Sequence, residues 1–199
     1  MHALPQHVPL IATLRGGHPE NIYYGSIAVV NANGRLVSRM GDISTPMFTR
    51  SALKPFQAMP LIAGFSDPYN LSDADVALLC ASHNGEAAHS SRAGALLKRA
   101  GCQETDLQCG THVPFYYTTN QLPTPDKGSY GRLQHNCSGK HAGMLATCLH
   151  LGEPTRGYIA PEHPQQRRVV AAFEAMLGLD LPNEVYAHVA GIDLIRHDD

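Results

Sequence analysis

The apolar positions of this chain change from a strand-like to a helix-like pattern at about residue 50. Short runs rich in β-branched residues at 10–14, 26–30 and 35–40 predict strands. Asn33-Gly34 lies between the second and third runs, and this dipeptide favours a hairpin because both residues tolerate a positive φ. We therefore expect the chain to begin with antiparallel strands.

Beyond these strands the apolar residues recur at helical spacing. The segment 51–64 predicts a helix in which Pro55 must lie near the first turn, because proline has no N–H to donate inside a helix. Ser72 and Asp75 form a capping-box pattern before the next apolar helix. The segment 102–132 is rich in Pro, Gly, Tyr and Thr, and we expect it to form loops that line a site. Further helices are predicted at 89–100, 139–151 and 164–177.

Composition narrows the class of protein. A chain of 199 residues with 43% hydrophobic residues can form a substantial core, and no repeat or linker divides it, so we expect one α/β (α+β) domain over residues 1–199. A net charge of −2 provides no basic face for nucleic acid, and no apolar run approaches the ~18 residues of a membrane span. The N-terminus lacks a basic segment followed by an apolar one, so we expect no export signal and a cytoplasmic protein.

The cysteine count of five is odd, which argues against a disulfide framework in such a protein. We expect free thiols or metal ligands. The five positions are Cys80, Cys102, Cys109, Cys137 and Cys148.

Ser51 and Lys54 are three residues apart, so a helix would place both side chains on one face, about 5–6 Å apart at Cβ. A serine hydroxyl needs a neighbouring base before it attacks a carbonyl, and a lysine can serve when its surroundings lower its pKa from about 10.4. The pair is therefore a candidate Ser–Lys dyad. The alternative is a helix N-cap serine followed by a solvated lysine.

A second polar motif, Ser82-His83-Asn84, follows later in the chain. Ser-x-x-Lys followed by Ser-x-Asn is the order found in serine β-lactamases and penicillin-binding proteins, where the second serine lies at the mouth of the same site. The Lys-Thr-Gly element of those enzymes is absent. The alternative interpretation of residues 82–85 is a polar helix end that enters a turn.

The segment 135–144 is the densest reactive stretch, and it precedes an apolar helix. Its reactive members are His135, Cys137, Lys140 and His141. We expect Cys109 and His112, from the loop region, to bring a second thiol and imidazole near this stretch. These spacings fit no common zinc finger or ribbon, and a thiolate at a helix N-terminus is also activated as a nucleophile. A metal site and a reactive cysteine are both open.

Together these motifs resemble the asparaginase II family, the rhizobial-type L-asparaginases. The matching strings cover nearly the whole chain to Asp193. They are Arg15-Gly16-Gly17, Glu20 with Gly25, Gly41-Asp42, Arg50 through Gln57, Ala81 through Glu86 with His89, Cys109-Gly110, His135 through Met144, and His163-Pro164-x-Gln166. The resemblance implies a serine β-lactamase/penicillin-binding-protein-like fold, a sheet with helices, and the hydrolysis of L-asparagine to L-aspartate and ammonia.

The resemblance also implies roles for individual residues. Ser51 is expected to be the nucleophile and Lys54 its base, while Ser82 belongs to a second Ser–Lys tandem. Zinc is expected near the nucleophile, bound by Cys137, Lys140 and a further cysteine; a lysine can ligate a metal only as the neutral amine. Members of the family are commonly homodimeric. The residues expected to bind substrate are Arg50, His83, Asn84 and His135.

The chain departs from the family after Asp193, where the family continues with Gly-Cys-Gly. Here residues 194–199 form a divergent polar tail. We expect the fold to be incomplete at its C-terminus, without one zinc ligand, the lysine of the second tandem and several strands. Tyr23 also stands where the family usually has histidine, which changes part of the expected substrate pocket.

Three functions are therefore to be compared. The first is an L-asparaginase-type amidohydrolase that acts through a Ser–Lys acyl-enzyme. The second is a truncated homologue, weakly active or inactive, that binds zinc or substrate only. The third is a β-lactam-reactive Ser–Lys acyl transferase.

Overall fold

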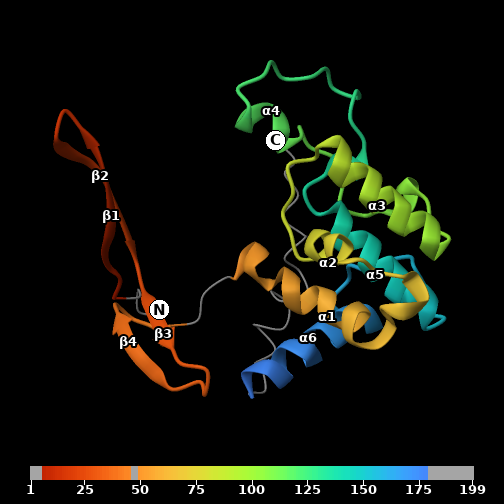
Figure 1. The fold of residues 1–199 in the computed structure, drawn as a ribbon, viewed down its shortest axis with the longest axis horizontal. Coiled ribbons are helices and arrows are strands. Elements are labelled where there is room, and N and C mark those ends of the chain that lie inside the picture. The colour runs from red at the N-terminus through yellow and green to blue at the C-terminus, as the bar shows by residue number, and fades with distance from the viewer. Residues whose placement is uncertain (1–5, 46–48, 179–199) are drawn as a thin grey trace. The chain divides into compact units, whose positions relative to one another are not determined.

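The computed structural model describes residues 6–45 and 49–178. The chain divides into two compact units, one within residues 1–48 and the other within residues 49–199 (Figure 1). The expectation of a single domain over residues 1–199 stays a prediction.

The first unit consists of two antiparallel hairpins. β1 (Val8–Arg15) pairs with β2 (His18–Gly25), and β3 (Ile27–Val30) pairs with β4 (Leu36–Met40). The predicted strands are confirmed, as is the Asn-Gly hairpin, in which Gly34 has a φ of 74° and donates its N–H to the carbonyl of Asn31. The sequence did not predict β2 because its first four residues, His-Pro-Glu-Asn, are polar or unsuited to strands.

The second unit is helical. Its α-helices are α1 (Lys54–Phe65), α2 (Asp73–Leu79), α3 (Ala87–Ala100), α4 (Phe115–Thr119), α5 (Ser138–His150) and α6 (Pro164–Leu177). Short 3₁₀ turns form η1 (Arg50–Leu53), η2 (Asp67–Tyr69), η3 (Glu104–Asp106) and η4 (Arg132–Gln134). All the predicted helices are confirmed, and Pro55 lies in the first turn of α1 as expected. The short helix α4 lies within a region predicted to be loops only.

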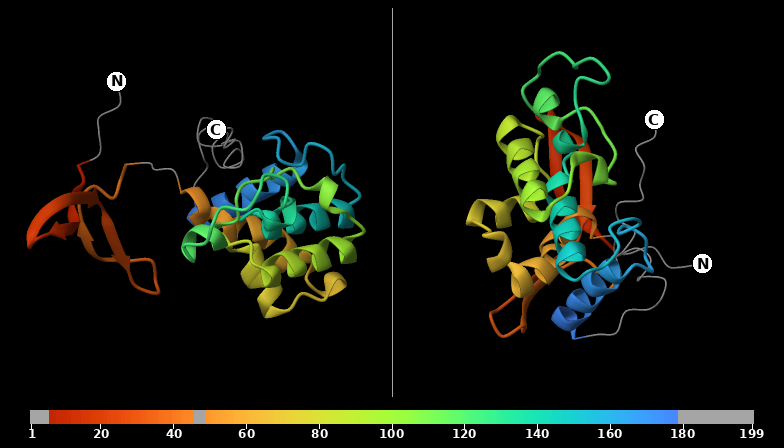
Figure 2. Two further views of the ribbon diagram at one scale, coloured as in Figure 1. Left: turned by 90° about the horizontal axis from the view of Figure 1, so that it is seen from above. Right: turned by 90° about the vertical axis from the view of Figure 1, so that its right-hand side faces the viewer.

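The core of this unit is organised around α5, whose residues are buried from Ser138 through Cys148. α5 contacts α1, α2, α3 and α6, and it lies side by side with α3 (Figure 2). Two glycines permit the close approach of α2 to α5. A Cβ at Gly139 would lie 2.8 Å from the carbonyl oxygen of Leu78, and one at Gly143 would lie 2.5 Å from Leu79 Cδ2. The absence of a side chain at Gly139 and Gly143 therefore allows α2 and α5 to pack closely.

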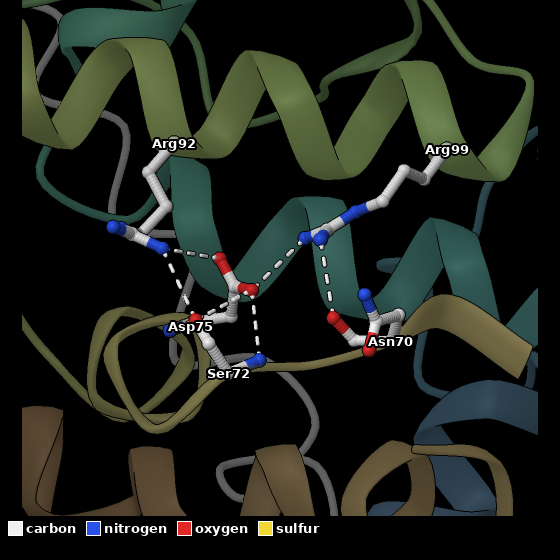
Figure 3. A network of polar contacts seen from close by, with 5 residues as sticks. All are labelled: Asn70, Ser72, Asp75, Arg92 and Arg99. Carbon is white, nitrogen blue, oxygen red and sulfur yellow. Dashed lines mark hydrogen bonds and ion pairs between the residues drawn. The ribbon is translucent and has the colours of Figure 1, made fainter. Parts of the chain in front are cut away.

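The predicted capping box at the start of α2 is confirmed, and it belongs to a larger polar network (Figure 3). The Asp75 carboxylate accepts from the Ser72 backbone N–H at 3.0 Å and forms ion pairs with Arg92 at 3.0 Å and Arg99 at 3.1 Å. Burial raises the pKa of Asp75, but these hydrogen bonds outweigh it and lower the pKa to about 2. The network therefore fixes α2 against α3 through a carboxylate that is ionised at neutral pH.

The described part of the chain is a mixed α+β structure with helices and two small antiparallel sheets, which confirms the predicted class at that level. None of the five cysteines forms a disulfide with another described residue. Among the described residues, no helix is both long and apolar enough to cross a membrane.

Candidate active site

Lys54 is the first residue of α1, and its side chain joins three segments of the second unit. The side chain is almost completely buried, at 2% exposure. Its Nζ lies 2.7 Å from Ser82 Oγ, 2.8 Å from the carbonyl oxygen of Ala81 and 3.4 Å from that of Asn136. A buried amine thus meets the hydroxyl of an exposed serine, Ser82. The structure brings together these two residues of the predicted catalytic set.

Ser51 lies in η1, three residues before Lys54, and is exposed. Within residues 6–45 and 49–178 the Ser51 hydroxyl makes no hydrogen bond. The Lys54 amine donates to the hydroxyl of Ser82, whereas the contact between Lys54 and Ser51 is a backbone hydrogen bond, from the Lys54 N–H to the Ser51 carbonyl oxygen. Arg50, directly before Ser51, has a φ of 48°. A non-glycine residue in the left-handed region costs about 1 kcal/mol or more, and such strain clusters at functional sites. The turn that carries Ser51 is therefore a strained one.

His83 is buried, and both of its ring nitrogens contact protein atoms. Nδ1 accepts the Gly85 backbone N–H at 3.1 Å, so the ring proton is on Nε2, which lies 2.9 Å from Ser138 Oγ. The Ser138 hydroxyl in turn donates to the carbonyl of Leu133 at 2.8 Å. The ring therefore links the Ser82 segment to the first turn of α5 through hydrogen bonds at both of its nitrogens.

The environment of His83 keeps it neutral. Burial, followed by the neighbouring His89, Lys54 and His112, lowers its pKa to about 4. The neutral ring can accept from Gly85 on one side and donate on the other, whereas a charged ring could not accept at all. Neutrality of His83 is therefore a condition of this arrangement.

Two further histidines, His135 and His112, lie in the same region of the second unit. The Nδ1 atom of His135 accepts the Cys137 backbone N–H at 3.0 Å, and its ring lies 4.4 Å from that of His112. His112 donates from Nδ1 to the Val113 carbonyl at 2.7 Å, which leaves Nε2 to accept the Asn136 N–H at 3.2 Å. The expected proximity of His112 to the 135–144 segment is thus observed.

Asn84 is half-buried, and its amide nitrogen lies 3.5 Å from a carboxylate oxygen of Glu86. Its backbone carbonyl accepts from Tyr116 N–H at 2.8 Å, which holds α4 next to the Ser82 segment. Of the residues expected to bind substrate, Arg50 is exposed, while Asn84 and His135 are half-buried.

Cys137 is the residue directly before α5, Lys140 lies in the first turn of that helix, and both are buried. A thiolate and a neutral amine are sulfur and nitrogen donors of the kind that zinc accepts. In residues 6–45 and 49–178 no group of three His, Cys, Asp or Glu side chains could hold a metal ion. The pair therefore fits zinc as part of a ligand set, and the segment after Asp193, where the resemblance expects a further ligand, lies outside the described residues.

The sequence did not reveal two residues that organise the site. The carbonyl oxygen of Asn136 accepts from Lys54 and also from the His83 backbone N–H at 3.2 Å. Ser138 is the partner of His83. The sequence does not indicate which backbone carbonyls accept side-chain hydrogen bonds. It also does not distinguish a buried serine at the start of a helix from an exposed serine at the same position.

Comparison with known proteins agrees with the motifs. A search of curated proteins gave no match. The family model described as L-asparaginase II matches residues 11–190, which include every residue of the site described above. The chain therefore belongs to the L-asparaginase II family.

Proposed function

We propose that this protein is an amidohydrolase that converts L-asparagine and water to L-aspartate and ammonia through an acyl-enzyme. The observation that carries the proposal is the buried Lys54 amine, 2.7 Å from the Ser82 hydroxyl and one turn after Ser51. Membership of the L-asparaginase II family supports an asparaginase-type hydrolase.

In the proposed reaction Ser51 Oγ attacks the side-chain amide carbon of asparagine. Lys54, as the neutral amine, takes the hydroxyl proton, which the collapse of the tetrahedral intermediate returns to the leaving ammonia. Water then attacks the ester carbon, Lys54 takes a proton from it, and aspartate leaves as Ser51 recovers its hydroxyl. Catalytic hydrogen bonds often tighten only when substrate binds, and we expect the Ser51 hydroxyl to bond the Lys54 amine in the complex with substrate.

Ser82 has a separate role in this scheme. Its hydroxyl accepts a hydrogen bond from protonated Lys54 and can pass a proton between Lys54 and the substrate amide. Because Lys54 also donates to two carbonyl oxygens, its ammonium form is well satisfied, and proton loss frees a lone pair toward the serine hydroxyls. We propose that exposed Arg50 binds the substrate carboxylate and that Asn84 and His135 line the same site.

We also propose that Cys137 and Lys140 contribute to a zinc site. When bound, zinc would hold the Lys140 amine neutral and fix the first turn of α5. Metal analysis of purified protein tests this proposal. We expect the zinc content to fall in Cys137→Ala, and an unchanged content would refute the site. The serine β-lactamase-like fold, the cytoplasmic location and the homodimer remain parts of the proposal.

Ammonia release from L-asparagine tests the proposed reaction. We expect activity in the unmodified chain, a loss of at least about 100-fold in Ser51→Ala, and an aspartyl adduct on Ser51 after acid quench. An adduct on Ser82 would transfer the role of nucleophile to that serine. Equal background from the unmodified chain and Ser51→Ala would contradict the enzyme and favour a homologue that only binds zinc or substrate. A penicillin adduct on Ser51 without ammonia release would favour the acyl transferase.

A further inference from the structure

The second unit contains a cavity away from Lys54 and Ser82. Its volume is about 450 Å³, and it is formed by the segment around η3, by η4 and by the turns after α5. This volume lies within the range of about 300–1,000 Å³ that is typical of small-molecule sites. The cavity is predominantly polar, and its lining includes Thr105, Asp106, Arg132, Thr155 and Arg156. None of the residues assigned to the candidate active site lines it.

Arg132 contributes a fixed guanidinium. Its Nη1 donates to the carbonyl oxygens of Thr105 and Leu107, both at 2.6 Å. These two bonds hold the guanidinium in place, while Nε and Nη2 donate to no atom of the described residues. No carboxylate within residues 6–45 and 49–178 forms an ion pair with it. Arg132 therefore adds to the cavity lining a positioned cation with unused donors.

Arg156 supplies a second guanidinium from the turn after α5. It is exposed, and in the part of the chain that the structure describes it has neither an ion pair nor a side-chain hydrogen bond. Asp106 is the carboxylate among the described lining residues, and one of its oxygens accepts the Gln103 backbone N–H at 2.8 Å. Two guanidiniums against one carboxylate leave the lining with a net charge of +1.

We propose that this cavity binds a small oxyanion that carries phosphate or carboxylate groups. Guanidinium groups match both kinds of anion because they present parallel N–H donors, and hydrogen bonds between ionised groups are roughly twice as strong as neutral ones. The hydroxyls of Thr105 and Thr155 add neutral donors at the same cavity. The inference is independent of the proposed hydrolysis, because it uses none of the catalytic residues.

Calorimetric titration of the purified chain tests the inference. Inorganic phosphate and succinate are the two anionic probes, and succinamide is the neutral control for succinate, all at constant ionic strength. We expect saturable 1:1 binding of at least one anion and none of succinamide. Binding of phosphate alone would assign the site to phosphate groups, and binding of succinate alone to carboxylates. Absence of saturable binding by either anion would overturn the proposal.

Matched variants locate the binding. Arg156→Gln removes the unpaired guanidinium without disturbing any hydrogen bond between described side chains, and we expect it to weaken binding at least about 5-fold. Arg167→Gln is the control, since Arg167 is an exposed arginine of α6 outside the cavity, and it should leave binding unchanged. Equal affinities for Arg156→Gln and the unmodified chain would also overturn the proposal.

Discussion

At the scale of single residues, His83 shows how the candidate site depends on protonation state. Its pKa is about 4 in the folded protein, below the ordinary value of 6.5, chiefly because the ring is buried. Between these two values the unfolded chain binds the proton more readily than the folded one. The stability that neutral His83 supports is therefore complete above about pH 6.5 and declines as the pH falls toward 4.

Replacement of His83 should make the free energy of unfolding depend less on pH in the acid range. We expect His83→Gln to lower the free energy of unfolding at pH 7 by about 1 kcal/mol, because it weakens the hydrogen bonds to Gly85 and Ser138. The dependence on pH between 6.5 and 4, up to about 1.4 kcal/mol per pH unit from this group, should largely disappear. Urea denaturation at several pH values measures both effects. His18→Gln is the exposed control, and a slope in His83→Gln equal to that of the unmodified chain would contradict the account.

Asp75 is an acid whose pKa is also lowered in the folded protein, and it affects stability at a lower pH than His83 does. Its pKa falls from 3.8 to about 2 because hydrogen bonds to Ser72, Arg92 and Arg99 outweigh the effect of burial. The folded state therefore gains stability from the carboxylate above about pH 4 and loses it as the pH falls through 2.

We expect Asp75→Asn to lower the free energy of unfolding at pH 7 by roughly 1.5–3 kcal/mol, since it removes the charge that two arginines contact. The gap between this variant and the unmodified chain should narrow as the pH falls from 4 to 2. The exposed Asp73 provides the control, because Asp73→Asn changes only the helix-dipole interaction, about 0.5 kcal/mol. A gap that stays constant down to pH 2 would show that Asp75 acts through shape and not through charge.

At the scale of elements, the position of α5 depends on the absence of side chains at its first turns. The would-be Cβ of Gly139 meets the Leu78 carbonyl oxygen at 2.8 Å, and backbone cannot move aside as a flexible side chain can. Gly94 of α3 is different, because its would-be Cβ meets Leu133 Cδ1 at an ordinary 3.5 Å. Two glycines in helices of one unit are therefore expected to respond oppositely to the same substitution.

We expect Gly139→Ala to destabilise the protein by about 1–3 kcal/mol through overpacking, despite the helix propensity of alanine. Gly94→Ala should be neutral or stabilising by up to about 1 kcal/mol. Thermal and urea denaturation of both variants provide the comparison. Equal stability of the two variants would mean that α2 and α5 do not approach as closely as the structure shows.

The elements also show what local sequence determines. Helices α1, α2, α3, α5 and α6 could be predicted because apolar residues repeat at helical spacing and because capping residues mark their ends. Strand β2 could not be predicted, since pairing with β1 forms it and that is not a property of its own residues. Whether such a segment forms a strand depends on contacts with residues distant in the sequence.

At the scale of the whole molecule, the candidate catalytic, metal-binding and substrate-binding residues from Arg50 to Lys140 all lie in the second unit. Tyr23, at a position of the expected substrate pocket, belongs to the first unit. Motif order predicted that the residues from Arg50 to Lys140 belong to one site. It did not predict that the serine next to Lys54 is Ser82, which is 28 residues away, because that contact follows from the packing of α1 beside the segment after α2. Nor did it predict that His83 is a structural tie with both nitrogens occupied.

We propose that the buried Lys54 amine is the base of an asparagine amidohydrolase, and the substitution Lys54→Arg tests this role most directly. Arginine keeps the positive charge and the hydrogen-bond donors, but it does not lose a proton at neutral pH. Ammonia release from L-asparagine is measured for the unmodified chain, for Lys54→Arg and for Lys98→Arg, an exposed control on α3, with circular dichroism to confirm folding. We expect activity to fall by about 100-fold or more in folded Lys54→Arg and to be unchanged in Lys98→Arg. Activity of folded Lys54→Arg within a few-fold of the unmodified chain would contradict this role of Lys54.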